Sequence, residues 1–167
     1  PNFCLQAAKN KKLFRSFKRS PLYTPILEHL SFQQGQEYLD LIIKESPELI
    51  PLFDRFRKND RIGNPNVYNY GSFGEFSPTT LRYIKVAAEL KKLFGSLDGL
   101  KIIEIGGGYG GQCTVLSKLF SWKEYTIVDI PGPVALITKY VQKQKVPNVH
   151  PITAEALIED DYDLVIS

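Results

Sequence analysis

The chain has 167 residues, of which 43% are hydrophobic and 23% charged, and its formal net charge is +3. This balance is close to that of globular domains and argues against a disordered chain. No apolar run approaches the roughly 20 residues that cross a bilayer, and no secretory signal opens the sequence. Cys4 and Cys113 lie too far apart in sequence for a paired metal motif, so we expect reduced thiols and a cytoplasmic location.

The first 20 residues carry six basic and no acidic side chains. Such a segment is typical of a solvated terminus, and contact with nucleic acid or an anionic membrane surface is the alternative. Phe14 and Phe17 lie among these charges, but they are weak grounds for stacking on bases, so nucleic acid is not an expected partner. Pro21 and Pro25 punctuate residues 1–30, which we therefore expect to be irregular.

Helical periodicity of apolar residues predicts three helices in the first half of the chain. The first covers about 33–46, and the second follows Pro47. The third begins after the N-cap Ser77 and covers 78–94, with Leu81, Ile84, Val86, Ala87, Leu90 and Leu93 on its inner face. Residues 59–77 hold four Asn and three Gly, which predicts a long loop of the kind that often carries function.

After residue 99 the pattern changes to strands that alternate with helices. Strands are predicted at 101–105, 125–129, 148–152 and 163–166, and helices at 112–120 and 133–145. This alternation is typical of βαβ units and predicts a parallel sheet with right-handed crossovers. The expected fold class is α/β, with a Rossmann-like doubly wound sheet in residues 99–167 and a helical N-terminal cap and lid region in residues 1–98.

The two ends of the sequence resemble those of a fragment. The chain has no methionine, and it stops at Ser167, directly after the apolar run of its last predicted strand. We therefore expect residues 99–167 to be the first half of a nucleotide-binding domain.

The most informative segment is Glu104-Ile-Gly-Gly-Gly-Tyr-Gly-Gly111, which lies where the first predicted strand ends and a helix begins. Glycine permits positive φ and the close approach of a ligand, and the helix N-terminus offers free N–H groups to an anion. Gly106, Gly108 and Gly111 fit the dinucleotide fingerprint. Glu104 followed by Gly106, Gly108 and Gly110 fits the pattern of S-adenosylmethionine (SAM) sites equally well.

The charge of Glu104 distinguishes these two ligand classes. A carboxylate beside the glycine turn would repel a pyrophosphate. It would attract a ligand that carries an ammonium and a sulfonium, by roughly 1–4 kcal/mol for a pair near 4 Å. The sequence therefore favours SAM over NAD, while capping of local backbone N–H groups remains the structural alternative for this side chain.

Asp129 closes the second predicted strand. A carboxylate at that position of a βαβ unit accepts hydrogen bonds from the two ribose hydroxyls of a bound nucleotide. Ile130 follows it and can pack on the adenine face. The alternative, an N-cap of the next helix, fits less well because Pro131 and Pro133 follow.

The segments 104–111 and 125–131 (YTIVDIP) resemble motifs I and II of class I SAM-dependent methyltransferases. The segments 62–65 (IGNP) and 76–83 (FSPTTLRY) are similar to a family of sugar O-methyltransferases. The first resemblance implies SAM as the cofactor and the strand order 3-2-1-4 among the four strands. The second implies a hydroxyl of a sugar or other small metabolite as the methyl acceptor.

The same resemblance implies a set of cofactor-binding residues. Gly106, Gly108 and Gly110 would line the methionine part of SAM, with Glu104 near its amino group. Asp129 would bind the ribose hydroxyls and Ile130 would flank the adenine.

Further cofactor contacts are expected from other elements. Ala154 and Glu155 follow the third strand, where the loop of this fold meets the adenine ring. Arg82, on the helix before the first strand, would meet the methionine carboxylate, with a solvated helix charge as the alternative. Tyr70 and Tyr83 are lid or substrate candidates, although ordinary packing is the favoured interpretation of both.

No catalytic base is assigned, because in this fold such groups follow the fourth strand or later elements. Asp160 and Asp161 favour an acidic turn over a metal site, so no metal is predicted. The leading hypothesis is a SAM-dependent O-methyltransferase with a small-molecule substrate, and homo-oligomer formation is left open. The alternatives are an NAD(P)-dependent oxidoreductase and a non-catalytic nucleotide-binding module.

Overall fold

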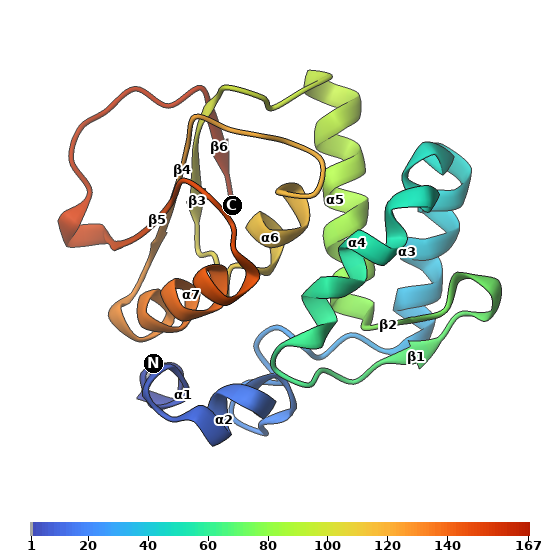
Figure 1. Cartoon of the computed structure of the whole chain (residues 1–167), viewed down its shortest axis with the longest axis horizontal. Helices are drawn as coiled ribbons and strands as arrows, with labels where there is room; N and C mark the ends of the chain where they lie inside the picture. The colour runs from blue at the N-terminus through green and yellow to red at the C-terminus, as the bar shows by residue number, and fades with distance from the viewer. Residues whose placement is uncertain (1) are drawn as a thin grey trace.

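A four-stranded parallel sheet forms the centre of one half of the computed structural model, which describes residues 2–167 (Figure 1). The strands are β3 (Lys101–Ile105), β4 (Glu124–Asp129), β5 (Val149–Thr153) and β6 (Leu164–Ile166). They lie side by side in the order β5-β4-β3-β6, and all neighbouring pairs are parallel. The predicted parallel sheet and the strand order 3-2-1-4 are confirmed.

The crossover helices are α6 (Gly111–Leu116) and α7 (Pro131–Gln144), and α7 packs on β4 and β5. Helix α6 is shorter than the predicted 112–120. The Thr114 hydroxyl donates to the carbonyl oxygen of Gly110 at 2.8 Å, and the Ser117 hydroxyl donates to that of Thr114 at 2.7 Å. Such local side-chain bonds compete with the backbone pattern of a helix, which ends here in turns.

The expectation that residues 1–30 are irregular is wrong for their first two thirds. They form α1 (Asn2–Lys9), α2 (Lys11–Ser16) and the 3₁₀ helix η1 (Phe17–Arg19). Asn10 caps α2, since its side-chain oxygen accepts from the backbone N–H groups of Lys12 and Leu13 at 2.9 and 3.1 Å. Helix α1 packs against α7, so tertiary contacts add to this local signal.

The basic N-terminal segment is only partly solvated. Phe14 and Phe17 are 6% and 0% exposed, so neither ring is available for stacking on bases. Lys18 is fully buried, and its Nζ donates to the carbonyl oxygen of Asn59 at 2.9 Å. The other basic side chains of the segment stay at the surface, where three of them line a groove with two lysines of α7: Lys9, Lys11, Arg15, Lys139 and Lys143.

The middle of the chain forms a helical layer beside the sheet half. It contains α3 (Phe32–Glu45), η2 (Pro47–Leu52), α4 (Phe53–Phe56), η3 (Arg57–Arg61) and α5 (Pro78–Phe94). The helix predicted after Pro47 is mostly 3₁₀, because Pro51 lacks the N–H group that an α-helix needs. The predicted loop at 59–77 includes η3, a short antiparallel pair of β1 (Tyr68–Asn69) with β2 (Glu75–Phe76), and η4 (Gly71–Phe73) between them.

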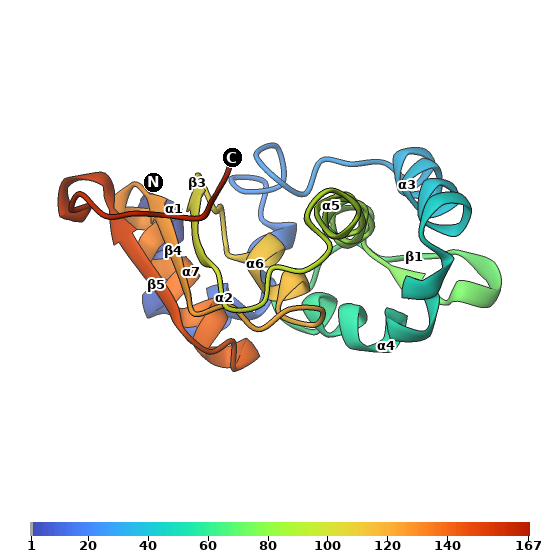
Figure 2. The ribbon, with the colours of Figure 1, turned by 90° about the horizontal axis from the view of Figure 1, so that it is seen from above.

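Helix α5 joins the two halves. It contacts α3 on one side and α6 on the other, and the view from above shows it between the sheet and the outer helices (Figure 2). Of the predicted inner face, Leu81, Ile84 and Ala87 are buried, Val86 and Leu90 are partly buried, and Leu93 in the last turn is 74% exposed. No helix in residues 2–167 has the length and apolarity required to cross a membrane.

Candidate nucleotide-binding site

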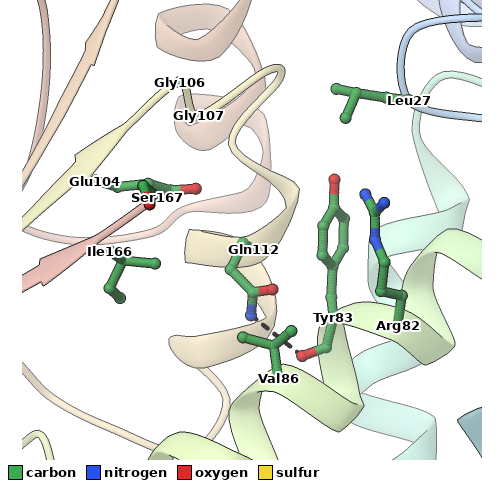
Figure 3. Close-up of a pocket in the computed structure, with 10 residues that line it drawn as sticks. All are labelled: Leu27, Arg82, Tyr83, Val86, Glu104, Gly106, Gly107, Gln112, Ile166 and Ser167. Carbon is green, nitrogen blue, oxygen red and sulfur yellow. Dashed lines mark hydrogen bonds between the residues drawn. The ribbon is translucent and has the colours of Figure 1, made fainter.

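Two cavities flank the glycine loop 106–110 at the carboxyl ends of β3 and β4. The Glu104 cavity has a volume of about 210 Å³, and its lining residues are drawn in Figure 3: Leu27, Arg82, Tyr83, Val86, Glu104, Gly106, Gly107, Gln112, Ile166 and Ser167. The Asp129 cavity has a volume of about 280 Å³ and is lined by Cys4, Tyr23, Ile26, Leu27, Gly106, Gly108, Asp129, Ile130 and Pro133. Gly106 and Leu27 line both cavities.

The glycine loop turns sharply between strand and helix. Gly106, Gly108 and Gly110 have φ of +79°, +61° and +84°, in the left-handed region that favours glycine. A side chain at Gly106 would meet no atom within 4 Å, so this position is open to a ligand. Gly110 lines neither cavity. A Cβ there would lie 2.9 Å from Val141 Cγ1, so this glycine allows the close packing of α7.

Glu104 lies on β3, where neighbouring strands cover it on both sides, and only 6% of it is exposed. The Tyr125 hydroxyl donates to its Oε2 at 2.8 Å. Burial raises the pKa of the Glu104 carboxyl to about 7, with a smaller contribution in the same direction from the charge of Asp129. Burial removes the water that would stabilise the ionised carboxylate, and a nearby cation can take its place. A cationic ligand would therefore stabilise the ionised form of Glu104.

Asp129 ends β4 and faces the neighbouring cavity. Its Oδ1 accepts from the backbone N–H of Ile130 at 2.8 Å, and its Oδ2 accepts from that of Gly108 at 3.1 Å. The carboxylate therefore fixes the glycine loop to the sheet. Because a carboxylate has about four acceptor positions, it can still accept further hydrogen bonds. It is not the N-cap of α7, which is Ile130 and has no capping side-chain bond.

Helix α5 supplies the opposite wall of the Glu104 cavity. The Gln112 side-chain Nε2 donates to the carbonyl oxygen of Tyr83 at 3.1 Å and ties α6 to α5. Arg82 and Tyr83 lie side by side, with the guanidinium carbon 5.3 Å from the centre of the tyrosine ring (Figure 3). Burial raises the pKa of Tyr83, so its hydroxyl stays protonated at neutral pH. This wall thus offers one cation and one neutral donor.

Other residues singled out by the sequence lie outside the two cavities. Ala154 and Glu155 are exposed in the 3₁₀ helix η5 (Ala154–Ala156), beyond β5, and line neither cavity. Tyr70 packs on Phe32, with ring centres 5.1 Å apart. Asp160 pairs with Lys101 at 2.5 Å. Within residues 2–167 no group of three His, Cys, Asp or Glu side chains is arranged to hold a metal ion.

Several lining residues were not predicted from the sequence, and four of them come from the N-terminal segment: Cys4, Tyr23, Ile26 and Leu27. All four lie more than 75 residues before the glycine loop. They reach the site because α1 packs on α7 and residues 20–31 cross over the glycine loop. No local motif marks such contacts.

No protein-family model and no curated protein matches the chain. Among solved structures it is similar to a protein assigned as a sarcosine dimethylglycine methyltransferase from Galdieria sulphuraria, with 23% identity over 52% of this chain and 35% of that one, at a TM-score of 0.45. It is also similar to coclaurine N-methyltransferase bound to N-methylheliamine and S-adenosylhomocysteine (SAH). That match has 14% identity, covers 80% of this chain and 43% of that one, and has a TM-score of 0.46.

A third similar structure is magnesium protoporphyrin IX methyltransferase from Synechocystis PCC 6803 with bound SAH. Here the identity is 18%, the coverage 79% of this chain and 57% of that one, and the TM-score 0.37. The chain spans between about a third and somewhat over half of the lengths of these three proteins. Its own sheet order and glycine loop define it as a Rossmann-like α/β protein.

Proposed function

We propose that the chain binds SAM and forms part of a cytoplasmic methyltransferase that transfers the methyl group to a hydroxyl of a sugar or other small metabolite. One observation carries this proposal. A buried carboxyl, Glu104, and a second carboxylate, Asp129, lie in adjacent cavities that share Gly106. An elongated ligand with a cationic amino acid at one end and a ribose at the other has the chemistry that these two cavities complement.

The charges disfavour a dinucleotide in the same place. A pyrophosphate on the glycine loop would lie beside both carboxyl groups, and Arg82 is the one cation among the lining residues of the two cavities. At a separation near 4 Å and intermediate dielectric, each like-charge contact costs about 1–4 kcal/mol. The ammonium group of SAM would gain a similar amount from Glu104.

We assign the following contacts under this proposal. Glu104 binds the ammonium of the cofactor, Gly106 and Gly108 contact its methionine part, and Asp129 accepts from the ribose hydroxyls. Ile130, which is 52% exposed at the rim of the Asp129 cavity, flanks the adenine. Gly110 contributes through the turn and the packing of α7. Ala154 and Glu155 remain predictions for the adenine edge.

When bound, SAM supplies an electrophilic methyl group. The residues of this chain orient the cofactor and exclude water. The buried Tyr83 ring and Leu27 close the Glu104 cavity, and the Asp129 carboxylate fixes the glycine loop through Gly108. Alignment of the acceptor hydroxyl and removal of its proton require further groups, and we assign no catalytic base to residues 2–167.

Arg82 is expected to bind the carboxylate of the cofactor. Replacing it in the variant Arg82→Gln should weaken SAH binding about tenfold, the value of one exposed charge-assisted hydrogen bond. Methylthioadenosine, which lacks the amino-acid end, should bind the variant as well as the wild type. Lys92→Gln, at an exposed position of the same helix, is the matched control. Equal losses for both ligands, measured by calorimetry, would place Arg82 outside the carboxylate site.

The proposal as a whole is tested by calorimetric titration of the protein with SAH beside NAD. We expect micromolar binding of SAH and no measurable binding of NAD. Binding of NAD without SAH would assign the glycine loop to an oxidoreductase instead. Binding of neither ligand would also contradict the proposal.

A further inference from the structure

The side chain of Leu27 lies on the glycine loop between the two cavities. It lines both of them, and its Cδ1 is 2.3 Å from the position that a Cβ at Gly108 would occupy. The methyl group is therefore in direct contact with the loop backbone. A ligand that extends from Glu104 to Asp129 has to cross the same surface, so it competes with Leu27 for Gly108.

Leu27 belongs to a segment, residues 21–30, that is built from turns. The buried ring of Tyr23, which packs edge-on against Phe17, anchors this segment in the core, and few hydrogen bonds add to that packing. Its backbone bonds are local, such as the one from the N–H of Tyr23 to the carbonyl oxygen of Ser20 at 2.8 Å. Among the hydrogen bonds of residues 2–167, one joins the segment to a distant element. It is the bond from the Thr79 hydroxyl to the Leu27 carbonyl oxygen, at 3.1 Å.

The same segment buries two polar atoms that have no hydrogen-bond partner, the hydroxyl oxygen of Tyr23 and Oε1 of Glu28. Buried polar groups without partners destabilise the arrangement that buries them. Burial also raises the pKa of the Glu28 carboxyl. The present arrangement of residues 21–30 thus carries a free-energy cost that an open arrangement would relieve.

We propose that residues 21–30 form a movable cover on the nucleotide site. Leu27 is its latch residue: its contact with Gly108 holds the cover closed, and the contact is lost when a ligand spans both cavities. This inference rests on the proposed function for the identity of the ligand. The contact of Leu27 with Gly108, from which the motion is inferred, does not depend on that identity. The cover closes over the Asp129 cavity in the free protein and opens to admit the cofactor.

The two cysteines of the chain can report this opening through their reactivity. Cys4 lines the Asp129 cavity together with Tyr23 and Ile26, and it is 5% exposed. Burial raises the pKa of its thiol, which slows alkylation in the closed arrangement. Cys113 lies on α6 and has no exposed surface, so we expect it to react only when the protein unfolds globally.

The experiment measures alkylation of each cysteine by iodoacetamide, followed by mass spectrometry, in the wild type and two variants. Leu27→Ala removes the latch contact and should speed the reaction of Cys4 about tenfold, because the closed arrangement loses buried apolar contact. Leu22→Ala, at an exposed position of the same segment, should leave the rate unchanged. SAH should bind Leu27→Ala several-fold faster in stopped-flow measurements. A constant rate at Cys113 shows that the variant is folded.

Equal Cys4 rates in the wild type and Leu27→Ala, with Cys113 protected in both, would overturn the cover. This outcome is distinct from failure of the proposed cofactor. If Leu27→Ala exposes Cys4 but SAH neither binds nor changes the alkylation rate of Cys4, the cover is supported and the SAM assignment is contradicted. If SAH binds the wild type and Leu27→Ala at the same rate, and the alkylation rate of Cys4 is the same in both, the SAM assignment is supported and the cover is contradicted.

Discussion

Glu104→Gln should stabilise the free protein while it weakens the binding of SAH. The folded-state pKa of this carboxyl is about 7, above its ordinary value of 4.5. The folded state therefore holds the proton more tightly than the unfolded state, and ionisation destabilises the fold as pH rises from about 4.5 to 7. The full cost above pH 7 is about 3 kcal/mol, from 1.36 kcal/mol per pKa unit. The neutral amide avoids this cost.

The melting temperature at pH 8 should accordingly be higher for Glu104→Gln than for the wild type, and the two should converge near pH 4.5. The amide oxygen still accepts from the Tyr125 hydroxyl, so the hydrogen bond at this site is retained. Glu124→Gln, on the neighbouring strand and partly exposed, is the matched control and should show no such pH-dependent gain.

The affinity for SAH should depend on the same ionisation of Glu104, but it should rise with pH where the stability of the free protein falls. The ammonium of SAH pairs with the ionised carboxylate, so wild-type affinity should fall by up to tenfold per pH unit below about pH 7. In Glu104→Gln this dependence should vanish, and affinity at pH 8 should be about 10- to 100-fold lower. An affinity for SAH that is equal in both proteins and independent of pH would exclude Glu104 from the ammonium site.

Asp129→Ala should have the largest effect on affinity. The substitution removes the acceptor for the two ribose hydroxyls and also the bond that fixes the N–H of Gly108. Hydrogen bonds to a charged group contribute about 1.5–3 kcal/mol each, so SAH binding should fall at least about 100-fold. Asp129→Asn retains one oxygen acceptor and should show an intermediate loss.

The pattern across ligands makes this prediction specific to the ribose. Methylthioadenosine and SAH both contain the ribose, so Asp129→Ala should weaken both, in contrast to Arg82→Gln. Asp161→Ala, an exposed acid outside both cavities, is the control. Calorimetric affinities within threefold of the wild type would show that the ribose does not bind at Asp129.

The sheet and the glycine loop could be predicted from the sequence because their signals are local. The apolar runs of β3 and β4, the glycines between Glu104 and α6, and the acid at the end of β4 each mark one position of a βαβ unit. The strand order came from the resemblance, since no local pattern sets the position of β6 beside β3.

A cap and lid region was expected in residues 1–98, but the helices of residues 2–19 and the contact of Leu27 with the glycine loop could not be predicted in the same way. The prolines after residue 20 dominated the interpretation of residues 1–30, whereas the capping signal of Asn10 and the burial of Phe17 decide the structure there. Leu27 reaches Gly108 through tertiary packing across about 80 residues of sequence. Glycine spacing alone also cannot distinguish Gly106, which is open to a ligand, from Gly110, which is packed against α7.

A crystal structure of this chain with bound SAH is the most direct test of a ligand that bridges the two cavities. The account predicts the amino nitrogen of SAH within hydrogen-bond distance of the Glu104 carboxylate, about 3 Å, and both ribose hydroxyls on Asp129. It also predicts that the Leu27 side chain has moved away from Gly108. SAH bound elsewhere, or in this site with its ribose away from Asp129, would contradict the account.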